Sequence, residues 1–489
     1  SLILGYLTVN FALTEINGFL TTLSCLTVFV LSTVYIRKCG LRPTPRQWIL
    51  GAGVCLFSCV FSITASGLLH VLNCIFLIGA QFWWIEAVAV KARFVTKYFL
   101  FDLIFTVFVQ PLCDFGAVPR AIKASAKGSK KAAGIGYAIL GLIITIPLTF
   151  IVALLLSSAD EGVNRMLVSI TEYISEDIFT TLFRIILAIP VGFLIFSSFR
   201  ADEVNKLYPL PSDVRYHEAA TKAAKLPPAG ILAGVTPICI LYLIYFISQA
   251  NYFLSAFSGV LPENMRYSQY ARQGFFELCA VAAINLVVIT IMLTLTKKHE
   301  NGRCTALTIY STLICIFTLF IISTALAKMF MYIGEYGLSR LRLYTAWFMI
   351  LLAAVFMILL IRGFVPRFRT SSALTSVFVI LFGILCFSRP DALIAQYNIS
   401  LYEQGVLETL DMKMLCELSD DSYIVMLDHY DTVKDIEWEL YPGLPGSDTA
   451  VFDDALSERL DQYRENPFSA LNLSSQLVII SSRSVSAIT

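Results

Sequence analysis

Long apolar segments follow one another along most of this chain, and short polar loops separate them. A helix of roughly 20 apolar residues crosses the hydrocarbon core of a membrane, so each segment of this length predicts a membrane span. The pattern predicts about eleven spans, approximately at residues 2–14, 17–36, 47–64, 70–90, 134–157, 179–199, 229–249, 274–296, 305–327, 342–362 and 372–387. The first segment is short, and because the sequence begins with Ser1 we expect it to be the remnant of a longer helix.

The stretch from Tyr98 to Cys113 is apolar but differs from the predicted spans. It contains Asp102, and Pro111 lies near its end. We therefore expect an interfacial or half-inserted helix there.

The segment 389–489 follows a different pattern. Its apolar residues recur at intervals of three and four, which predicts amphipathic helices, and a further helix is expected at Val451 to Arg464 after a loop. The sequence therefore predicts an all-α fold with two domains. These are a polytopic integral membrane helix bundle at 1–388 and a small, acidic, amphipathic helical tail domain at 389–489.

Composition agrees with a membrane protein, because 57% of the residues are hydrophobic and only 15% are charged. The net charge of +1 conceals a division between the two predicted domains. Residues 389–489 contain 18 acidic and 6 basic residues, a net charge of −12, so the first 388 residues carry about +13. The basic residues are scattered through short loops and form no continuous stripe, so no nucleic-acid partner is expected.

The distribution of Lys and Arg predicts the orientation of the spans. Short cytoplasmic loops accumulate these residues, and alternate loops of this chain do so, from Arg37 and Lys38 in the first to Arg367 and Arg369 in the last. All of these bases lie inside if the N-terminus is inside. Eleven crossings then place the acidic tail on the outer side.

Ionisable residues within the spans, or at their outer ends, form the candidate site. Such residues are costly in a membrane and are normally paired or face a wet cavity, so they are functional candidates. The seven on the predicted outer side comprise five bases and two acids, and Asn285 shares a helix face with one of these acids, while Glu86 lies near the inner end of its span. The candidate ligand-binding residues are Arg184, Arg272, Glu277, Asn285, Lys328, Glu335, Arg340 and Arg342. The last four are expected at the junction between the ninth and tenth spans, with Tyr336 and Arg340 on one helix face.

Three interpretations of this cluster remain open. In the first, Glu277 and Glu335 neutralise the nearby arginines and lock the helices together. In the second, the excess of positive charge binds an anionic ligand such as a lipid head group or a phosphorylated carrier lipid, because guanidinium groups match phosphate oxygens. In the third, the cluster receives the acidic tail of the same protein.

Sequence signatures of catalysis and of metal binding are missing. The chain contains no HExxH, GxSxG, Walker loop or dinucleotide fingerprint, so no catalytic residue, cofactor or metal site is predicted. Cys55 and Cys59 are one helical turn apart, but without a nearby His or acid they favour helix packing over a metal site. The acidic doublets at 420–421 and 453–454 are expected at solvated helix ends rather than around a divalent cation.

A family resemblance rests on several separated strings. They are YARQGFFEL at Tyr270 to Leu278 with AAIN ending at Asn285, GEYGLSRLRLY at Gly334 to Tyr344, RPDALIAQYNI at Arg389 to Ile399, LD at Leu410 and Asp411, LSDDS at Leu418 to Ser422, and LNLS at Leu471 to Ser474. They resemble segments of a bacterial family of multi-pass membrane proteins that carries only a domain-of-unknown-function label, the 4153/4173 group. Members tend to have Asn before the proline of the third string, where this chain has Arg389. The resemblance implies a bacterial cytoplasmic (inner) membrane protein and no established activity, catalytic residue or cofactor.

Three classes of function remain. A protein that binds or moves an anionic lipid or envelope solute needs a polar lining, which the charged cluster supplies. A membrane sensor or scaffold needs only the acidic tail and an envelope protein as its partner. A lipid-linked glycosyltransferase-like enzyme needs an acid in an early external loop, where only Glu15 is available, so an enzyme is the weaker expectation. Apart from the bilayer, the expected partners are therefore an anionic lipid or an envelope protein.

Overall fold

The computed structural model is predominantly helical. It describes residues 2–10, 18–89, 95–114, 176–200, 213–224, 226–258, 275–297, 305–365, 367–439, 449–465 and 472–485, with single positions between them. Within these residues there is one sheet, of two strands. The chain divides into two compact units. Unit 1 comprises Ser1–Phe94, Leu100–Leu210 and Tyr463–Gln476, and unit 2 comprises Val95–Phe99, Pro211–Gln462 and Leu477–Thr489.

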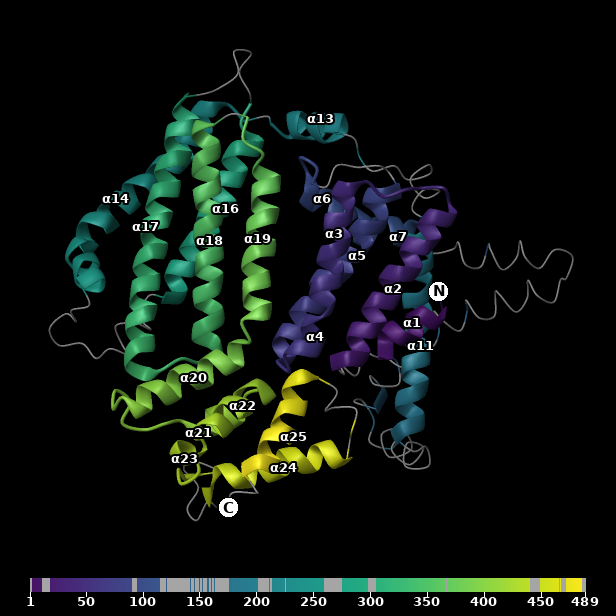
Figure 1. Cartoon of the computed structure of the whole chain (residues 1–489). Coiled ribbons are helices and arrows are strands. Elements are labelled where there is room, and N and C mark those ends of the chain that lie inside the picture. The colour runs from purple at the N-terminus through teal and green to yellow at the C-terminus, as the bar shows by residue number, and fades with distance from the viewer. Residues whose placement is uncertain are drawn as a thin grey trace, which may run out of the picture. The chain divides into compact units, whose positions relative to one another are not determined.

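The described part of unit 1 contains long and short helices. Three of them, α2 (Gly18–Lys38), α3 (Pro45–Ser58) and α5 (Gly67–Ala89), pack on one another, with the short α4 (Val60–Ile63) between α3 and α5 (Figure 1). Among the described residues, this unit also contains α1 (Leu2–Thr8), α6 (Phe99–Ile104, from Leu100 onwards), the π-helical turn η2 (Phe105–Val109), α7 (Gln110–Cys113), α11 (Glu176–Phe199) and the residues Tyr463–Gln476.

Local sequence accounts for the start of α3. Thr44 Oγ1 accepts a hydrogen bond from Gln47 N–H, and Gln47 Oε1 accepts one from Thr44 N–H. Pro45 occupies the first helical position, where its missing N–H costs nothing. This capping box supplies partners for backbone groups that a helix N-terminus otherwise leaves unpaired.

Small and aromatic residues set the packing within unit 1. Trp84 is fully buried, and its ring centroid lies 5.3 Å from that of Phe29 and 5.3 Å from that of Trp48. A Cβ atom placed on Gly5 would lie 2.6 Å from the backbone nitrogen of Gly192. Glycine thus lets α1 and α11 approach closely, as small residues do between membrane helices.

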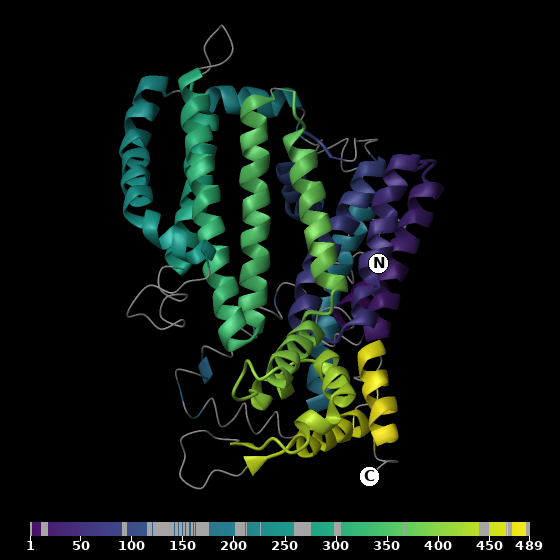
Figure 2. The same ribbon diagram turned by 60° about the vertical axis from the view of Figure 1, so that its left-hand side comes forward.

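The described part of unit 2 contains five long helices that follow one another in sequence. α17, α18 and α19 lie side by side, and α14 and α16 pack against α17 (Figure 1, Figure 2). The shorter α13 precedes them. The bounds are α13 (Asp213–Ala223), α14 (Pro228–Ser258), α16 (Phe275–Leu295), α17 (Thr305–Tyr336), α18 (Arg340–Phe364) and α19 (Thr370–Phe387).

Short helices follow α19. They are α20 (Pro390–Glu403), α21 (Met412–Cys416), α22 (Asp420–Asp428), α23 (Tyr430–Val433), α24 (Phe452–Glu465) and α25 (Leu473–Val485). Strands β1 (Trp438–Glu439) and β2 (Thr449–Ala450) pair antiparallel, with Trp438 opposite Ala450. The helix expected at 451–464 is α24. One hydrophobic core joins α18 to these helices, from Met349 and Phe356 to Ile394 and Met426.

Eight helices among the described residues are long and apolar enough to cross a membrane. They are Gly18–Lys38, Pro45–Ile63, Gly67–Ala89, Pro228–Ile247, Leu278–Leu295, Thr305–Tyr336, Arg340–Phe364 and Thr370–Phe387. Each coincides with a predicted span. Of the other three predicted spans, 134–157 lies almost wholly outside the described residues, and 2–14 and 179–199 are described only in part. A shorter apolar helix occupies Phe99–Cys113, where a short helix was expected.

Candidate functional site

The turn between α17 and α18 carries the centre of the predicted charged cluster. Arg340 and Arg342 lie in the first turn of α18. The junction is shorter than expected, because α17 continues to Tyr336. Lys328 and Glu335 therefore lie within α17, and only residues 337–339 connect the two helices.

Gly337 sets the break between the helices. Its φ of +73° lies in the left-handed region, which glycine adopts without the penalty that a Cβ atom brings. A left-handed residue directly after the last helical residue is a common way to end a helix. The expected shared helix face of Tyr336 and Arg340 is wrong, because this turn separates them.

Asn398 of α20 holds this turn in place. Leu338 N–H donates to Asn398 Oδ1 at 2.6 Å, and Asn398 Nδ2 donates to Leu338 O at 2.8 Å. The Asn398 side chain is buried. One amide group therefore satisfies both backbone polar groups of Leu338, which buried backbone requires.

Arg342 closes the C-terminal end of α17. Its Nη1 donates to Tyr336 O at 2.8 Å and to Gly337 O, and its Cζ lies 4.1 Å from the centroid of the Tyr332 ring. The last carbonyl groups of a helix have no partner within the helix, and a cation there also interacts favourably with the helix dipole. The guanidinium group of Arg342 thus caps the C-terminal end of α17.

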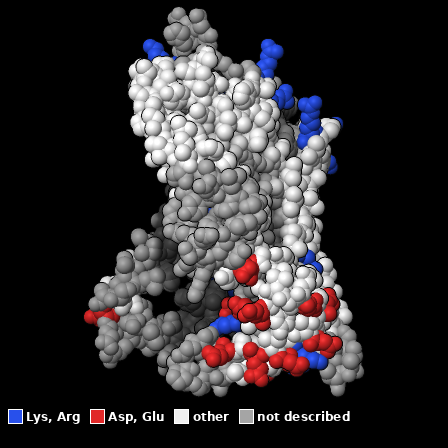
Figure 3. Space-filling model, turned by 90° about the vertical axis from the view of Figure 1, so that its left-hand side faces the viewer, with Lys and Arg blue, Asp and Glu red and all other residues white. Residues whose placement is uncertain are grey.

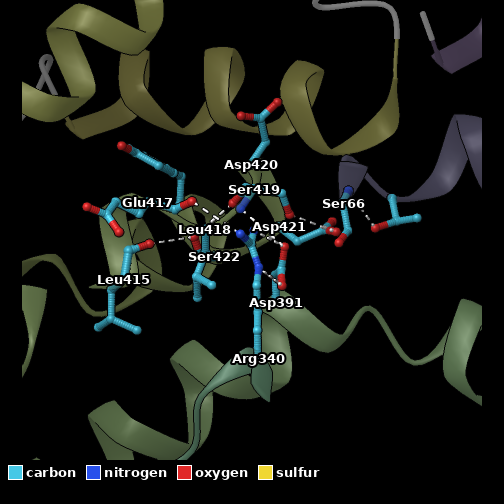
Figure 4. Close-up of polar contacts among 12 residues, drawn as sticks. Ser66, Arg340, Asp391, Leu415, Glu417, Leu418, Ser419, Asp420, Asp421 and Ser422 are labelled. Atoms are coloured by element: carbon cyan, nitrogen blue, oxygen red, sulfur yellow. Dashed lines mark hydrogen bonds and ion pairs between the residues drawn. The ribbon is translucent and has the colours of Figure 1, made fainter. Parts of the chain in front are cut away.

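Arg340 forms a bidentate ion pair with Asp391 of α20 (Figure 4). Arg340 Nε donates to Asp391 Oδ1 at 3.0 Å, and Arg340 Nη2 donates to Asp391 Oδ2 at 2.8 Å. Ser419 N–H donates to the same Oδ2 at 3.2 Å, and Arg340 Nη1 donates to Glu417 O at 3.5 Å. Two parallel charge-assisted bonds fix distance and direction together.

The carboxyl group of Asp391 stays ionised. Burial by itself raises its pKa, but hydrogen bonds from Arg340 and Ser419 outweigh burial and hold the pKa below its ordinary value. Both carboxylate oxygens accept from donors, so at neutral pH Asp391 is an acceptor and not a proton donor. The geometry therefore supports a positioning role, in which Asp391 joins α20 to the start of α18.

Two further pairs surround the start of α22. Arg389 Nε donates to Asp421 Oδ1 at 2.9 Å, and Arg459 Nε lies 3.4 Å from Asp420 Oδ1. The expectation that the doublet 420–421 lies at a solvated helix end is wrong in one respect. Both residues begin α22, but they are buried and paired with arginine, because Arg389 and Arg459 come from elsewhere in the chain. We name Arg340–Asp391, Arg389–Asp421 and Arg459–Asp420 together the arginine–aspartate network.

Arg389 has a φ of +50°, the one positive value at a non-glycine position in the described part of the chain. Asn tolerates this left-handed region better than most residues with a side chain. An Asn at this position would therefore carry less backbone strain than an arginine does. In this chain the ion pair with Asp421 offsets the backbone strain.

The other predicted site residues do not join this network. Arg184 lies in α11 of unit 1, where its Nη1 donates to Asn10 Oδ1 at 3.0 Å. Lys328 is half-buried and Glu335 is exposed. Arg272, the side chain of Glu277, and Glu15 lie outside the described residues.

Asn285 is buried in α16 and links three helices. Tyr242 Oη of α14 donates to Asn285 Oδ1, and Asn285 Nδ2 donates to Thr318 Oγ1 of α17 at 2.8 Å. Asn285 and Thr318 are fully buried. Burial keeps the Asn285 amide group away from lipid, and its contacts give Asn285 a role in helix packing.

Sequence reasoning missed the acidic half of the arginine–aspartate network. Asp391 and Asp421 both lie in strings on which the family resemblance rests, but no sequence pattern predicts that they pair with arginines. Arg340 and Asp391 are 51 residues apart, so no local spacing joins them. Among the three interpretations of the cluster, the contacts of Arg340 match the one in which it receives the acidic tail.

Eight apolar helices of spanning length define this chain as a helical, multi-span membrane protein. The sequence model of a domain of unknown function, DUF4153, matches residues 51–429, more than half of the chain. The chain therefore belongs to the DUF4153 family, in agreement with the resemblance of its sequence strings. Comparisons with curated proteins and with solved structures give no match.

Proposed function

We propose that this protein is a membrane scaffold or sensor whose segment 389–489 forms an acidic helical domain that binds an envelope partner. The arginine–aspartate network carries this proposal. Arg340, a base of the predicted cluster, pairs with Asp391 and so holds this segment at the start of α18, and the pairs Arg389–Asp421 and Arg459–Asp420 join helices within the segment. An anionic lipid or solute at Arg340 would have to displace Asp391, and one at Arg342 would have to displace two carbonyl groups. Lipid handling at this cluster therefore has less support.

The charge of unit 2 supports a surface for a basic partner. Exposed acids gather on the helices after α19, as the face in Figure 3 shows. Asp435, Glu437 and Glu439 are all exposed within one short stretch. Buried acids of the same segment are paired with arginine, whereas these face solvent. Complementary charge on a partner accelerates association and selects among partners.

The two ends of the unit 2 helices also differ in charge, which supports an orientation. Arg362, Arg367 and Arg369 lie around the turn between α18 and α19. The arginine–aspartate network lies at the other end of these two helices, because α18 has 25 residues and spans roughly 37 Å. With eleven spans and the bases inside, the tail faces the outer side of a bacterial inner membrane.

A topology experiment tests this orientation. A reporter that is active on one side of the membrane only is fused after Thr489, and a second fusion is placed at Arg367 between α18 and α19. We expect outside activity for the fusion at Thr489 and inside activity for the fusion at Arg367. Activity on the same side at both positions would contradict the proposed orientation.

Site-specific photo-crosslinking tests the partner. A crosslinking side chain at Glu437 should give a discrete protein adduct in cells, and neutralising Asp435→Asn with Glu439→Gln should reduce the adduct several-fold. The control is the same crosslinker at Ile309, an exposed apolar position of α17, which should not give this adduct. Absence of an adduct at Glu437, or an adduct that survives neutralisation, would overturn recognition by the acidic surface.

A further inference from the structure

The helix Phe99–Cys113 in unit 1 has an unusual division of polar and apolar residues. Its exposed large side chains are apolar, namely Leu100, Phe101, Ile104, Phe108, Val109 and Leu112. A stripe of buried polar residues, four apart, runs along its other face and comprises Asp102, Thr106, Gln110 and Asp114. A water-soluble helix has the opposite arrangement. An apolar outer face with a polar inner face fits a helix that separates lipid from a polar interior.

The polar stripe borders a small pocket between this helix, α5 and α11. The pocket is lined by Phe82, Glu86, Thr106, Gln110, Pro111, Ser197 and Ser198. The cavity volume, measured as the space that the centre of a water molecule can occupy, is about 10 Å³. One water molecule needs roughly 10–15 Å³ by the same measure, so the pocket has room for one particle of that size.

Two hydroxyl groups in the pocket indicate an occupant. Thr106 Oγ1 and Ser197 Oγ are buried and have no hydrogen-bond partner among the described residues. The exposed fractions of these residues are 3% and 2%. Buried polar atoms in folded proteins nearly always have a partner, so two such oxygens in the lining of one pocket point to a bound water or ion.

Glu86 supplies the charge of this pocket. It is 1% exposed, and Gln110 Nε2 donates to its Oε1 at 3.4 Å. A buried carboxylate is stable only with compensating charge or strong donors. At the end of the stripe, Arg120 and Arg200 form ion pairs with Asp114.

Backbone geometry adds to the site. Phe105–Val109 forms a π-helical turn, in which Gln110 N–H donates to Phe105 O, five residues earlier. Pro111 follows and has no N–H, so it removes one donor from the preceding turn. Single π-helical turns occur frequently at functional sites, and helix irregularity within a membrane is tolerated where it lines a cavity.

We propose that this pocket binds one small monovalent cation of the sodium type. Glu86 balances its charge, and Thr106, Ser197 and the amide oxygen of Gln110 supply neutral ligands. Oxygen ligands suit hard cations, and irregular helix segments in membranes coordinate such ions. Glu86 is the one carboxylate among the residues that line the pocket, so its charge matches a monovalent cation better than a divalent one. This site is independent of the proposed scaffold function.

Thermal unfolding of the full-length protein in detergent tests the site. Sodium chloride replaces N-methylglucamine chloride at constant ionic strength and pH, and radioactive sodium binding gives a second readout. The midpoint temperature of thermal unfolding should rise by about 2 °C or more at saturating sodium. Glu86→Gln should abolish this rise and the sodium binding, and Ser197→Ala should weaken the apparent affinity about tenfold.

The matched control is Thr27→Val, which removes an exposed hydroxyl of α2 and should leave the sodium response unchanged. If Glu86→Gln does not fold, Thr106→Val and Ser197→Ala carry the test. An unchanged sodium response in the folded variants would overturn the proposal. A wild-type protein that responds to no cation would also overturn it, because the pocket would then hold only water. A response to magnesium and not to sodium would overturn it as well.

Discussion

Replacing Asp391 by alanine should lower the free energy of unfolding of unit 2 by about 3 kcal/mol. The change leaves the guanidinium group of Arg340 without its carboxylate and Ser419 N–H without its acceptor. Removing one partner of a buried ion pair costs roughly 3–5 kcal/mol. The lower end applies because the Arg340 side chain is 39% exposed and solvent screens its charge. Denaturant unfolding in detergent measures the loss.

Two variants sharpen this measurement. Glu408→Ala removes an exposed acid of the same segment and should change stability by less than about 0.5 kcal/mol. Replacing Arg340 and Asp391 together by leucine should recover part of the loss, because apolar side chains often substitute well for a buried pair. A single Asp391→Ala variant as stable as the wild type would contradict the positioning role of Asp391.

The pH dependence of the same variant checks the sign of the interaction. The folded-state pKa of Asp391 lies below its ordinary value of about 3.9, so the stabilisation is fully present above that value. It is lost as the pH falls through the folded-state pKa. The difference in stability between wild type and Asp391→Ala should therefore be constant from about pH 7 to pH 5 and should shrink towards pH 3. A difference that grows in acid would contradict this assignment.

Gly337→Ala should destabilise unit 2 by about 3 kcal/mol, for two reasons that add. The left-handed φ of +73° costs a residue with a side chain about 1–2 kcal/mol. A Cβ atom would also lie 2.5 Å from Asn398 Oδ1, and relieving such a clash in a packed region costs roughly 1–3 kcal/mol. Thermal unfolding and the proteolytic susceptibility of the turn between α17 and α18 measure the effect.

Gly405 provides the matched control for this substitution. Its φ of +72° is nearly the same, but no atom lies within 4 Å of a Cβ placed there. Gly405→Ala should therefore cost only the conformational part, about 1–2 kcal/mol. The excess at Gly337 measures the contact with Asn398, and it should shrink when Gly337→Ala is combined with Asn398→Ala. Equal losses at the two glycines would mean that Asn398 does not hold the turn.

Membrane helices and tail helices were predictable from local pattern. All eight spanning helices of the described residues, and the helix at Phe452–Glu465, fall where hydrophobic length or periodicity placed them. The length of the turn at Gly337 was not predictable in the same way. Apolar residues continue past the expected end of the ninth span, and only the left-handed glycine shows where α17 stops.

The polar stripe in Phe99–Cys113 lay within reach of sequence reasoning. Asp102, Thr106, Gln110 and Asp114 follow one another at intervals of four, which is a helical pattern. Asp102 by itself argues against a membrane span, whereas the full stripe predicts one polar helix face. Glu86 stood apart from the outer-side cluster, and only the packing of α5 against η2 and of α11 against α7 shows that a pocket includes it.

Local sequence alone establishes that this is a helical membrane protein of the DUF4153 family, with spans of known approximate position and a strongly acidic C-terminal segment. Insertion of a span depends on the summed hydropathy of some 20 consecutive residues, so the local sequence is sufficient to predict each span. The partners of the charged residues came only from the tertiary structure. Arg340 meets Asp391 across 51 residues, and Glu86 meets Gln110 across 24, because folding brings distant helices together.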